Sequence, residues 1–110
     1  MKKPYRNLTS NEIAQLEQQF CSAENWAEVR VHPRFAPEFV REVRFSGRVR
    51  LGCFADSFTL PGGVRRHSGL RNVALHNCEI GDDVLIENVQ NYIANYVIGN
   101  RTFIQNLNRL

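Results

Sequence analysis

Ile80-Gly81-Asp82-Asp83-Val84-Leu85 and Ile98-Gly99-Asn100-Arg101-Thr102-Phe103 are two copies of one hexad pattern, eighteen positions apart. In each copy an aliphatic residue precedes Gly, and the fifth place holds a β-branched residue. Such an internal repeat is the first feature to interpret in any sequence. The same offset relates further pairs: Leu75 and Ile93, Ile86 and Ile104, Asn77 and Asn95, and Asn88 and Asn106.

Eighteen positions make three hexads, so the repeat predicts a triangular coil with one hexad on each side. Each coil then stacks on the previous one through parallel backbone pairing, with strands ~4.8 Å apart. Ile80 and Ile98 are expected to stack in the interior. Gly81 and Gly99 are expected at corners, where glycine tolerates unusual backbone angles. Asparagines at matching positions, such as Asn77, are expected to form ladders along the stack.

The pattern over Val73 to Asn106 resembles the hexapeptide-repeat superfamily, whose coils are left-handed and triangular. The segments 45–52, 61–64 and 80–82 also resemble the N-terminal region of a longer bacterial family catalogued as a domain of unknown function. The resemblance implies a mainly β fold: a left-handed parallel β-helix of about two to three coils. Because the family's members continue through many more coils, we expect this chain to be a truncated piece of such a helix.

The N-terminal part predicts one short α-helix within residues 7–20. Thr9 is a good N-cap, and Glu12, three positions on, completes a capping box. An apolar stripe at helical spacing follows: Ile13, Leu16 and Phe20. We therefore expect residues 1–42 to be a helix with an irregular capping segment. Residues 43–110 are expected to form a strand followed by the start of the hexapeptide-repeat β-helix, within one structural domain.

An arginine-rich strand is predicted where apolar residues alternate with polar ones from Val43 to Leu51. Its basic residues belong to a wider cluster: Arg30, Arg34, Arg41, Arg44, Arg48 and Arg50. Clustered arginines of this kind are typical of a nucleic-acid footprint. Glutamates are interleaved, however, and regularly spaced aromatic residues are lacking. A solvated strand face is the favoured interpretation, and nucleic-acid binding is the less favoured alternative.

Composition limits the class of protein. The chain has 110 residues, 43% of them hydrophobic, and a net charge of +3. Its apolar runs are far shorter than the ~20 residues needed to cross a bilayer. Without an apolar signal segment, a cytoplasmic protein is expected. The wide spacing of Cys21, Cys53 and Cys78 predicts neither a disulfide framework nor a metal site.

His76 is the candidate catalytic residue. Its context, Leu75-His76-Asn77-Cys78-Glu79-Ile80-Gly81-Asp82, resembles the phrase around the catalytic histidine of hexapeptide acyltransferases that act on UDP-linked amino sugars. The resemblance implies that His76 is a general base, which suits imidazole chemistry near neutral pH. It also implies acyl-CoA or acyl carrier protein as donor, and sites between subunits of a homotrimer. A plain surface histidine is the alternative.

A second candidate site is the run Arg65, Arg66 and His67, which predicts binding of an anionic group. The alternative is a solvated loop. No glycine-rich phosphate loop accompanies it, because neither G-x-x-x-x-G-K-[ST] nor G-x-G-x-x-G occurs.

Three functions remain open at this point. The resemblance favours the N-terminal part of a bacterial hexapeptide-repeat protein of transferase ancestry, working in acyl transfer or sugar-nucleotide handling. On that interpretation this fragment alone is inactive, contains no cofactor and needs either C-terminal coils or partner subunits. The first alternative is a non-catalytic scaffold or oligomerisation module. The second is nucleic-acid binding through Arg30 to Arg50.

Overall fold

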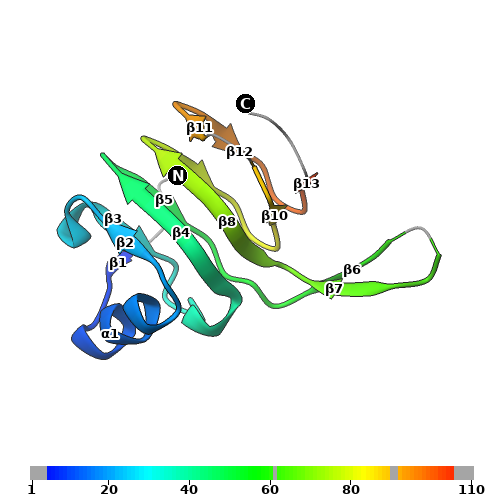
Figure 1. Cartoon of the computed structure of the whole chain (residues 1–110), viewed down its shortest axis with the longest axis horizontal. Helices are drawn as coiled ribbons and strands as arrows, with labels where there is room; N and C mark the ends of the chain where they lie inside the picture. The colour runs from blue at the N-terminus through cyan, green and yellow to red at the C-terminus, as the bar shows by residue number, and fades with distance from the viewer. Residues whose placement is uncertain (1–4, 61, 90–91, 106–110) are drawn as a thin grey trace.

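The computed structural model describes residues 5–60, 62–89 and 92–105. In this part of the chain, short strands form two largely parallel sheets, and a projecting hairpin forms a third (Figure 1). Sheet A has the order β1 (Arg6–Asn7), β3 (Val29–Val31), β5 (Val49–Leu51), β9 (Glu79–Ile80) and β12 (Val97–Ile98). Sheet B has the order β13 (Phe103–Gln105), β10 (Leu85–Glu87), β8 (Gly69–His76), β4 (Val40–Ser46) and β2 (Ser22–Ala23), and β11 (Ile93–Ala94) also pairs with β8.

One hydrophobic core contains buried side chains from both sheets. Sheet A contributes its aliphatic residues, and sheet B contributes a matching set along its two long strands. Because the chain passes back and forth between the sheets, each pass adds a buried residue to the same core. The members with no exposed surface include Val31, Val49, Leu51, Ile80, Val40, Val43, Leu70, Val73, Leu75 and Ile86.

The pairing at constant offset expected from the repeat is confirmed. Ile80 lies opposite Ile98, Leu75 opposite Ile93, and Ile86 opposite Ile104, all in parallel strands. Asn77 Nδ2 also donates to Asn95 Oδ1 at 3.4 Å, so the expected asparagine contact is present. Asn106 lies outside the described residues. The repeat therefore determines the pairing of β9 with β12, of β8 with β11 and of β10 with β13.

The expected single left-handed parallel β-helix is wrong. The described residues form several sheets, and two strand pairs are antiparallel: β1 with β3, and β6 (Ser57–Thr59) with β7 (Arg65–His67). The spacing between parallel partners is also uneven. Ser46 pairs with His76, 30 positions further on, whereas Arg71 pairs with Glu87, 16 positions further on. A uniform coil of three hexads requires one constant offset, which the chain does not have.

Two local features explain the difference. The turn at Gly62 and Gly63, both at positive φ, reverses the chain and creates the β6–β7 hairpin, which extends away from the sheets in Figure 1. That insertion lengthens the spacing between paired residues of β4 and β8. Gly47, at φ +65°, breaks the single strand expected from Val43 to Leu51, and the two halves join different sheets as β4 and β5.

The N-terminal helix is confirmed in a shorter form. Helix α1 spans Ser10–Gln18, with Thr9 as N-cap and a capping box to Glu12. Leu16 is fully buried, but Phe20 is 79% exposed, so the end of the expected apolar stripe does not reach the core. Two 3-10 turns, η1 (Trp26–Glu28) and η2 (Pro37–Phe39), follow. Nowhere in the described ranges does a helix combine the length and apolar character that crossing a membrane demands.

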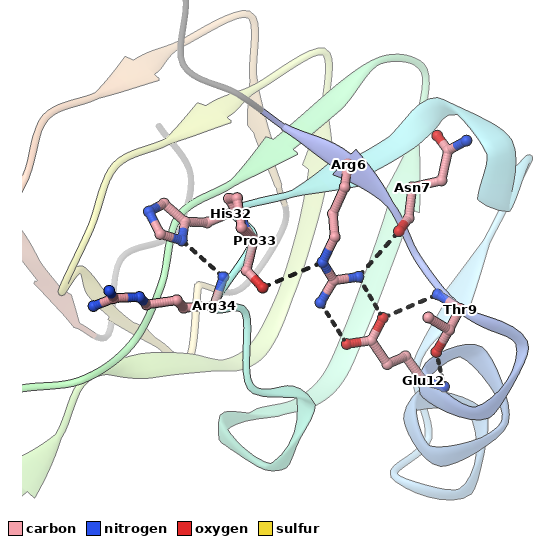
Figure 2. A network of polar contacts seen from close by, with 7 residues as sticks. All are labelled: Arg6, Asn7, Thr9, Glu12, His32, Pro33 and Arg34. Atoms are coloured by element: carbon pink, nitrogen blue, oxygen red, sulfur yellow. Dashed lines mark hydrogen bonds and ion pairs between the residues drawn. The ribbon is translucent and has the colours of Figure 1, made fainter.

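Arg6 and Glu12 join β1 to the start of α1, as Figure 2 shows. The Arg6 guanidinium donates to both carboxylate oxygens of Glu12, at 2.8 and 2.9 Å. It also donates to Pro33 O at 3.3 Å, which ties β1 to the loop after β3. Glu12 in turn accepts from the Thr9 amide at 2.9 Å. The Arg6 hydrogen bond and then the Thr9 bonds lower the pKa of Glu12 against an opposing effect of burial.

Glu12→Gln is therefore expected to lower the free energy of unfolding by about 1 kcal/mol at neutral pH. Because the pKa of Glu12 is lower in the folded chain, its contribution is fully present above its unfolded value of about 4.5. The contribution is lost as the pH falls through the folded pKa. Urea denaturation across the acid range measures this. The exposed Glu17, replaced by Gln on the same helix, is the control; an equal pH effect there would contradict the assignment.

Candidate functional site

A cavity of about 340 Å³ lies against sheet A, where β5, β9 and β12 run side by side. Pockets that bind small molecules have volumes of roughly this size and above. Its lining combines cationic, amide and aromatic groups: Arg48, Arg50, Asn77, Cys78, Glu79, Asn95, Tyr96 and Val97. The cavity thus offers several polar groups to one ligand.

Positive charge predominates in the cavity, since two arginines face one glutamate. Arg50 is anchored, because its Nη1 donates to Glu28 O at 3.0 Å and to Val49 O at 2.9 Å. Burial lowers the pKa of the Arg50 guanidinium, and the cations of Arg48 and Arg30 lower it further. Glu79 lies on the neighbouring strand β9. Among the described residues, no arginine or lysine nitrogen lies within ion-pair distance of its carboxylate. An anion beside Arg48 and Arg50 would relieve their mutual repulsion.

Asn77 has a well-defined orientation at the edge of the cavity. Its Oδ1 accepts from the Arg48 amide at 2.9 Å, and its Nδ2 donates to Asn95 at 3.4 Å. A Cβ on Gly47 would lie 2.1 Å from Asn77 Oδ1, so only glycine at that position leaves room for the amide. The side chain is thus fixed by neighbours on two other strands or turns.

His76, the predicted catalytic residue, is exposed and adjoins the cavity through Asn77. Its Nδ1 lies 2.8 Å from Ser46 Oγ, and its Nε2 lies 3.0 Å from Asn77 Nδ2. Because the Asn77 amide donates at Nε2, the neutral ring carries its proton on Nδ1 and donates it to Ser46. His76 Nε2, which accepts from the Asn77 amide, is therefore the ring nitrogen with the lone pair that can accept a proton.

The predicted anion-binding run is separated by the structure. Arg66 forms an ion pair with Glu87, which is only 1% exposed. His67 stacks on Phe39 with ring centroids 3.7 Å apart, and its Nδ1 hydrogen bonds with Ser68 O. Arg65 is exposed on the hairpin. Arg66 and His67 thus have different partners, and anion binding by the three residues stays a prediction.

The basic cluster is divided between the sheets. Arg30 and Arg50 lie on neighbouring strands of sheet A, whereas Arg41 and Arg44 lie on β4 of sheet B. Nucleic-acid binding by the whole cluster also stays a prediction. Of its members, Arg48 and Arg50 are those that line the cavity.

Sequence reasoning missed the cavity. The alternating pattern places Arg48 and Arg50 on a solvated strand face, and Tyr96 departs from the repeat. The repeat itself contained one usable signal, since Asn77 and Asn95 occupy matching positions and both line the cavity. Nothing in the sequence relates Arg50 to Glu79, which are opposite one another although they are far apart along the chain.

Comparisons with known proteins identify a family but no activity. Residues 5–110 match the family model described as "Domain of unknown function (DUF4954)". A Treponema pallidum (strain Nichols) protein described as "Uncharacterized protein" is 28% identical over 114 residues. That alignment covers 98% of this chain but 15% of the relative, so the chain spans a small part of the relative's length. No solved structure matches the chain.

Proposed function

Since this chain belongs to the DUF4954 family, whose model covers residues 5–110, we propose that it is the ligand-binding part of a longer protein of transferase ancestry. The cavity beside Asn77 takes the phosphate groups of a nucleotide-linked sugar. The observation that carries this proposal is the convergence of Arg48, Arg50, Asn77 and Asn95 on one cavity of about 340 Å³. Guanidinium groups are the preferred partners of phosphate, because their paired donors match its oxygens.

The chemistry proposed for the longer protein uses His76. With Nδ1 held by Ser46 and Nε2 directed at Asn77, the ring accepts a proton from a sugar hydroxyl or amine as that group attacks an acyl donor. Acyl-CoA or an acyl carrier protein is the donor class. The regular pairing of β9 with β12 and of β10 with β13 supports descent from hexapeptide-repeat proteins.

Arg48→Gln tests the ligand part of the proposal. The Arg48 side chain is exposed at the cavity, so its removal is expected to weaken binding of a UDP-linked amino sugar roughly tenfold. Titration calorimetry with the UDP-sugar, with inorganic pyrophosphate and with the uncharged sugar identifies the group that is recognised. Binding of the uncharged sugar alone would contradict the phosphate assignment.

Arg44→Gln is the matched control, because it removes the same charge from exposed chain on sheet B. An equal loss in both variants would indicate non-specific charge attraction instead of a site. His76→Gln separates binding from chemistry: binding of the UDP-sugar is retained, whereas acyl transfer by the longer protein is lost. Transfer that survives this substitution would remove His76 from the mechanism.

A scaffold or oligomerisation role is the second candidate, and the edges of the two sheets favour it. Among the described strands, β12 lies at one edge of sheet A and β13 at one edge of sheet B. Large apolar side chains on or next to these edges are exposed, namely Tyr96 at 45%, Val97 at 75% and Phe103 at 39%. Unpaired strand edges with apolar residues favour pairing with further strands. A discrete oligomer together with no saturable ligand binding would favour this role over the transferase proposal.

A further inference from the structure

His32, Cys53 and Asp82 approach one another beside sheet A. One potential ligand atom from each, an imidazole nitrogen, the thiol sulfur and a carboxylate oxygen, lie within 4.8 Å of one another. All three residues are partly exposed, so a dissolved ion can reach them. They are far apart in the sequence and form no local motif.

The strand register produces this approach. Val31 pairs with Leu51 and Leu51 with Ile80, in three adjacent parallel strands. The backbone ladder continues past the strand ends, because the His32 amide donates to Leu51 O and the Gly52 amide to Ile80 O, both at 2.8 Å. The residues that follow β3, β5 and β9 therefore emerge next to one another.

Gly52 makes space for the carboxylate in this group. A Cβ at position 52 would lie 2.4 Å from Asp82 Oδ1. The same oxygen accepts from the Cys53 amide at 3.1 Å, which holds the carboxylate beside the cysteine. The backbone of residues 52 and 53 thus forms a cradle for Asp82.

The charges around this cradle favour a cation. Within the described ranges no arginine or lysine forms an ion pair with Asp82. Asp83 adds a second carboxylate next to Asp82, and its Oδ1 accepts from the Ala55 amide at 2.9 Å.

We propose that His32, Cys53 and Asp82 form a binding site for one Zn²⁺ ion. Zinc accepts nitrogen, sulfur and oxygen ligands at about 2.0–2.3 Å in tetrahedral geometry, which places ligand atoms about 3.5 Å apart. The three ligand atoms must therefore close by on the order of 1 Å to reach this geometry. On binding, the Cys53 thiol loses its proton to solvent and the thiolate coordinates the ion. A fourth position is left for water or another ligand, as in zinc sites with three protein ligands.

His32 has a hydrogen bond that the metal must replace or rearrange. Its Nδ1 accepts from the Arg34 amide at 3.0 Å, visible in Figure 2. In the neutral ring this places the proton on Nε2. A metal ion at Nδ1 displaces the Arg34 amide, and one at Nε2 requires the opposite tautomer. Either way, the amide signal of Arg34 and the ring nitrogens of His32 shift in NMR spectra on metal binding.

Titration of the untagged, reduced chain with Co²⁺, followed by competition with Zn²⁺, tests the proposal. The expected spectrum has a thiolate-to-cobalt charge-transfer band and the d–d bands of tetrahedral Co²⁺ at one equivalent. Cys53→Ser removes the charge-transfer band. His32→Gln and Asp82→Asn weaken zinc binding by more than the about 10- to 100-fold that loss of an outer-shell partner costs. Asp82→Asn keeps an oxygen for the Cys53 amide, so it is the variant least expected to disturb folding.

Cys78→Ser and His67→Gln are the matched controls, because each replaces the same residue type at a position outside the proposed zinc site. Both controls are expected to bind as the unchanged protein does. Absence of a charge-transfer band in the unchanged protein would overturn the proposal. So would unchanged zinc affinity in Cys53→Ser, or a band lost in Cys78→Ser instead. His32, Cys53 and Asp82 do not line the cavity proposed for the sugar ligand, so either proposal can fail without the other.

Discussion

Replacing both arginines that hold Glu87, in Arg66→Met/Arg71→Met, is expected to lower the free energy of unfolding by about 3–5 kcal/mol. Glu87 is 1% exposed, and one of its oxygens accepts from both guanidinium groups, from Arg71 at 2.8 Å. Gln105 donates to the other oxygen at 3.0 Å. Without the arginines a buried carboxylate keeps one described donor, Gln105, and no described cation. Equilibrium urea denaturation measures the loss.

The triple variant Arg66→Met/Arg71→Met/Glu87→Gln distinguishes the cause. It removes the buried charge together with its partners, so most of the lost stability is expected to return. Arg65→Met/Arg44→Met, which removes two exposed arginines, is expected to stay within about 0.5 kcal/mol of the unchanged protein. A double variant as stable as this control would mean that Glu87 is adequately solvated without its arginines. A triple variant as unstable as the double would assign the loss to the arginine side chains themselves.

Gly52→Ala is expected to lower the free energy of unfolding by about 1–3 kcal/mol, the range for overpacking a filled site. The new Cβ would lie 2.4 Å from Gly81 O and 2.6 Å from Gly81 C, which are backbone atoms of the neighbouring strand segment. It would also lie 2.4 Å from Asp82 Oδ1. Because the backbone cannot move aside as a flexible side chain can, the two segments must separate. Thermal and urea denaturation both measure this effect.

Gly99→Ala is the matched control for this substitution. Gly99 holds the position equivalent to Gly81 in the second copy of the repeat, yet a Cβ there meets no described atom within 4 Å. Its expected effect is a few tenths of a kcal/mol at most, in either direction. A large loss in Gly99→Ala would indicate that another strand covers this position, as a scaffold stacked on β12 requires. Equal small effects in both variants would contradict the close approach of residues 52 and 81.

Local pattern accounts for the parts of the fold that were predicted correctly. The capping box of Thr9 and Glu12 follows from the spacing of these two residues at a helix start. The pairings of Ile80 with Ile98 and of Ile86 with Ile104 follow from a repeat without insertions between its copies. The role expected of Gly81, an unusual backbone angle at a corner of the coil, is wrong, however. Gly81 does not take a positive φ; a Cβ there would lie 2.4 Å from Asn100 Oδ1, so close approach is the reason for glycine.

Asparagine and other side-chain-bearing residues occupy the left-handed turns that were expected to need glycine. Asn77 and Asn95 have φ values of 51° and 63°, and Asp83 and Arg101 repeat the same feature at equivalent positions of the two hexads, at 55° and 58°. Asparagine and aspartate tolerate this region better than most residues. The corners expected at Gly81 and Gly99 were therefore wrong, because the positive φ lies two positions later, at Asp83 and Arg101.

The sequence by itself determined local structure and neighbours at constant offset: the capped helix, the strand pairs of the repeat and the contact between Asn77 and Asn95. These depend on short-range periodicity, which a single sequence displays. Only the tertiary structure decided that β4 and β5 separate at Gly47 and that a hairpin lies between β5 and β8. That insertion sets the long offsets between Arg50 and Glu79 and between Ser46 and His76. Because no periodic signal encodes such offsets, the Arg48–Arg50 cavity and the His32–Cys53–Asp82 group exist only after folding aligns these strands.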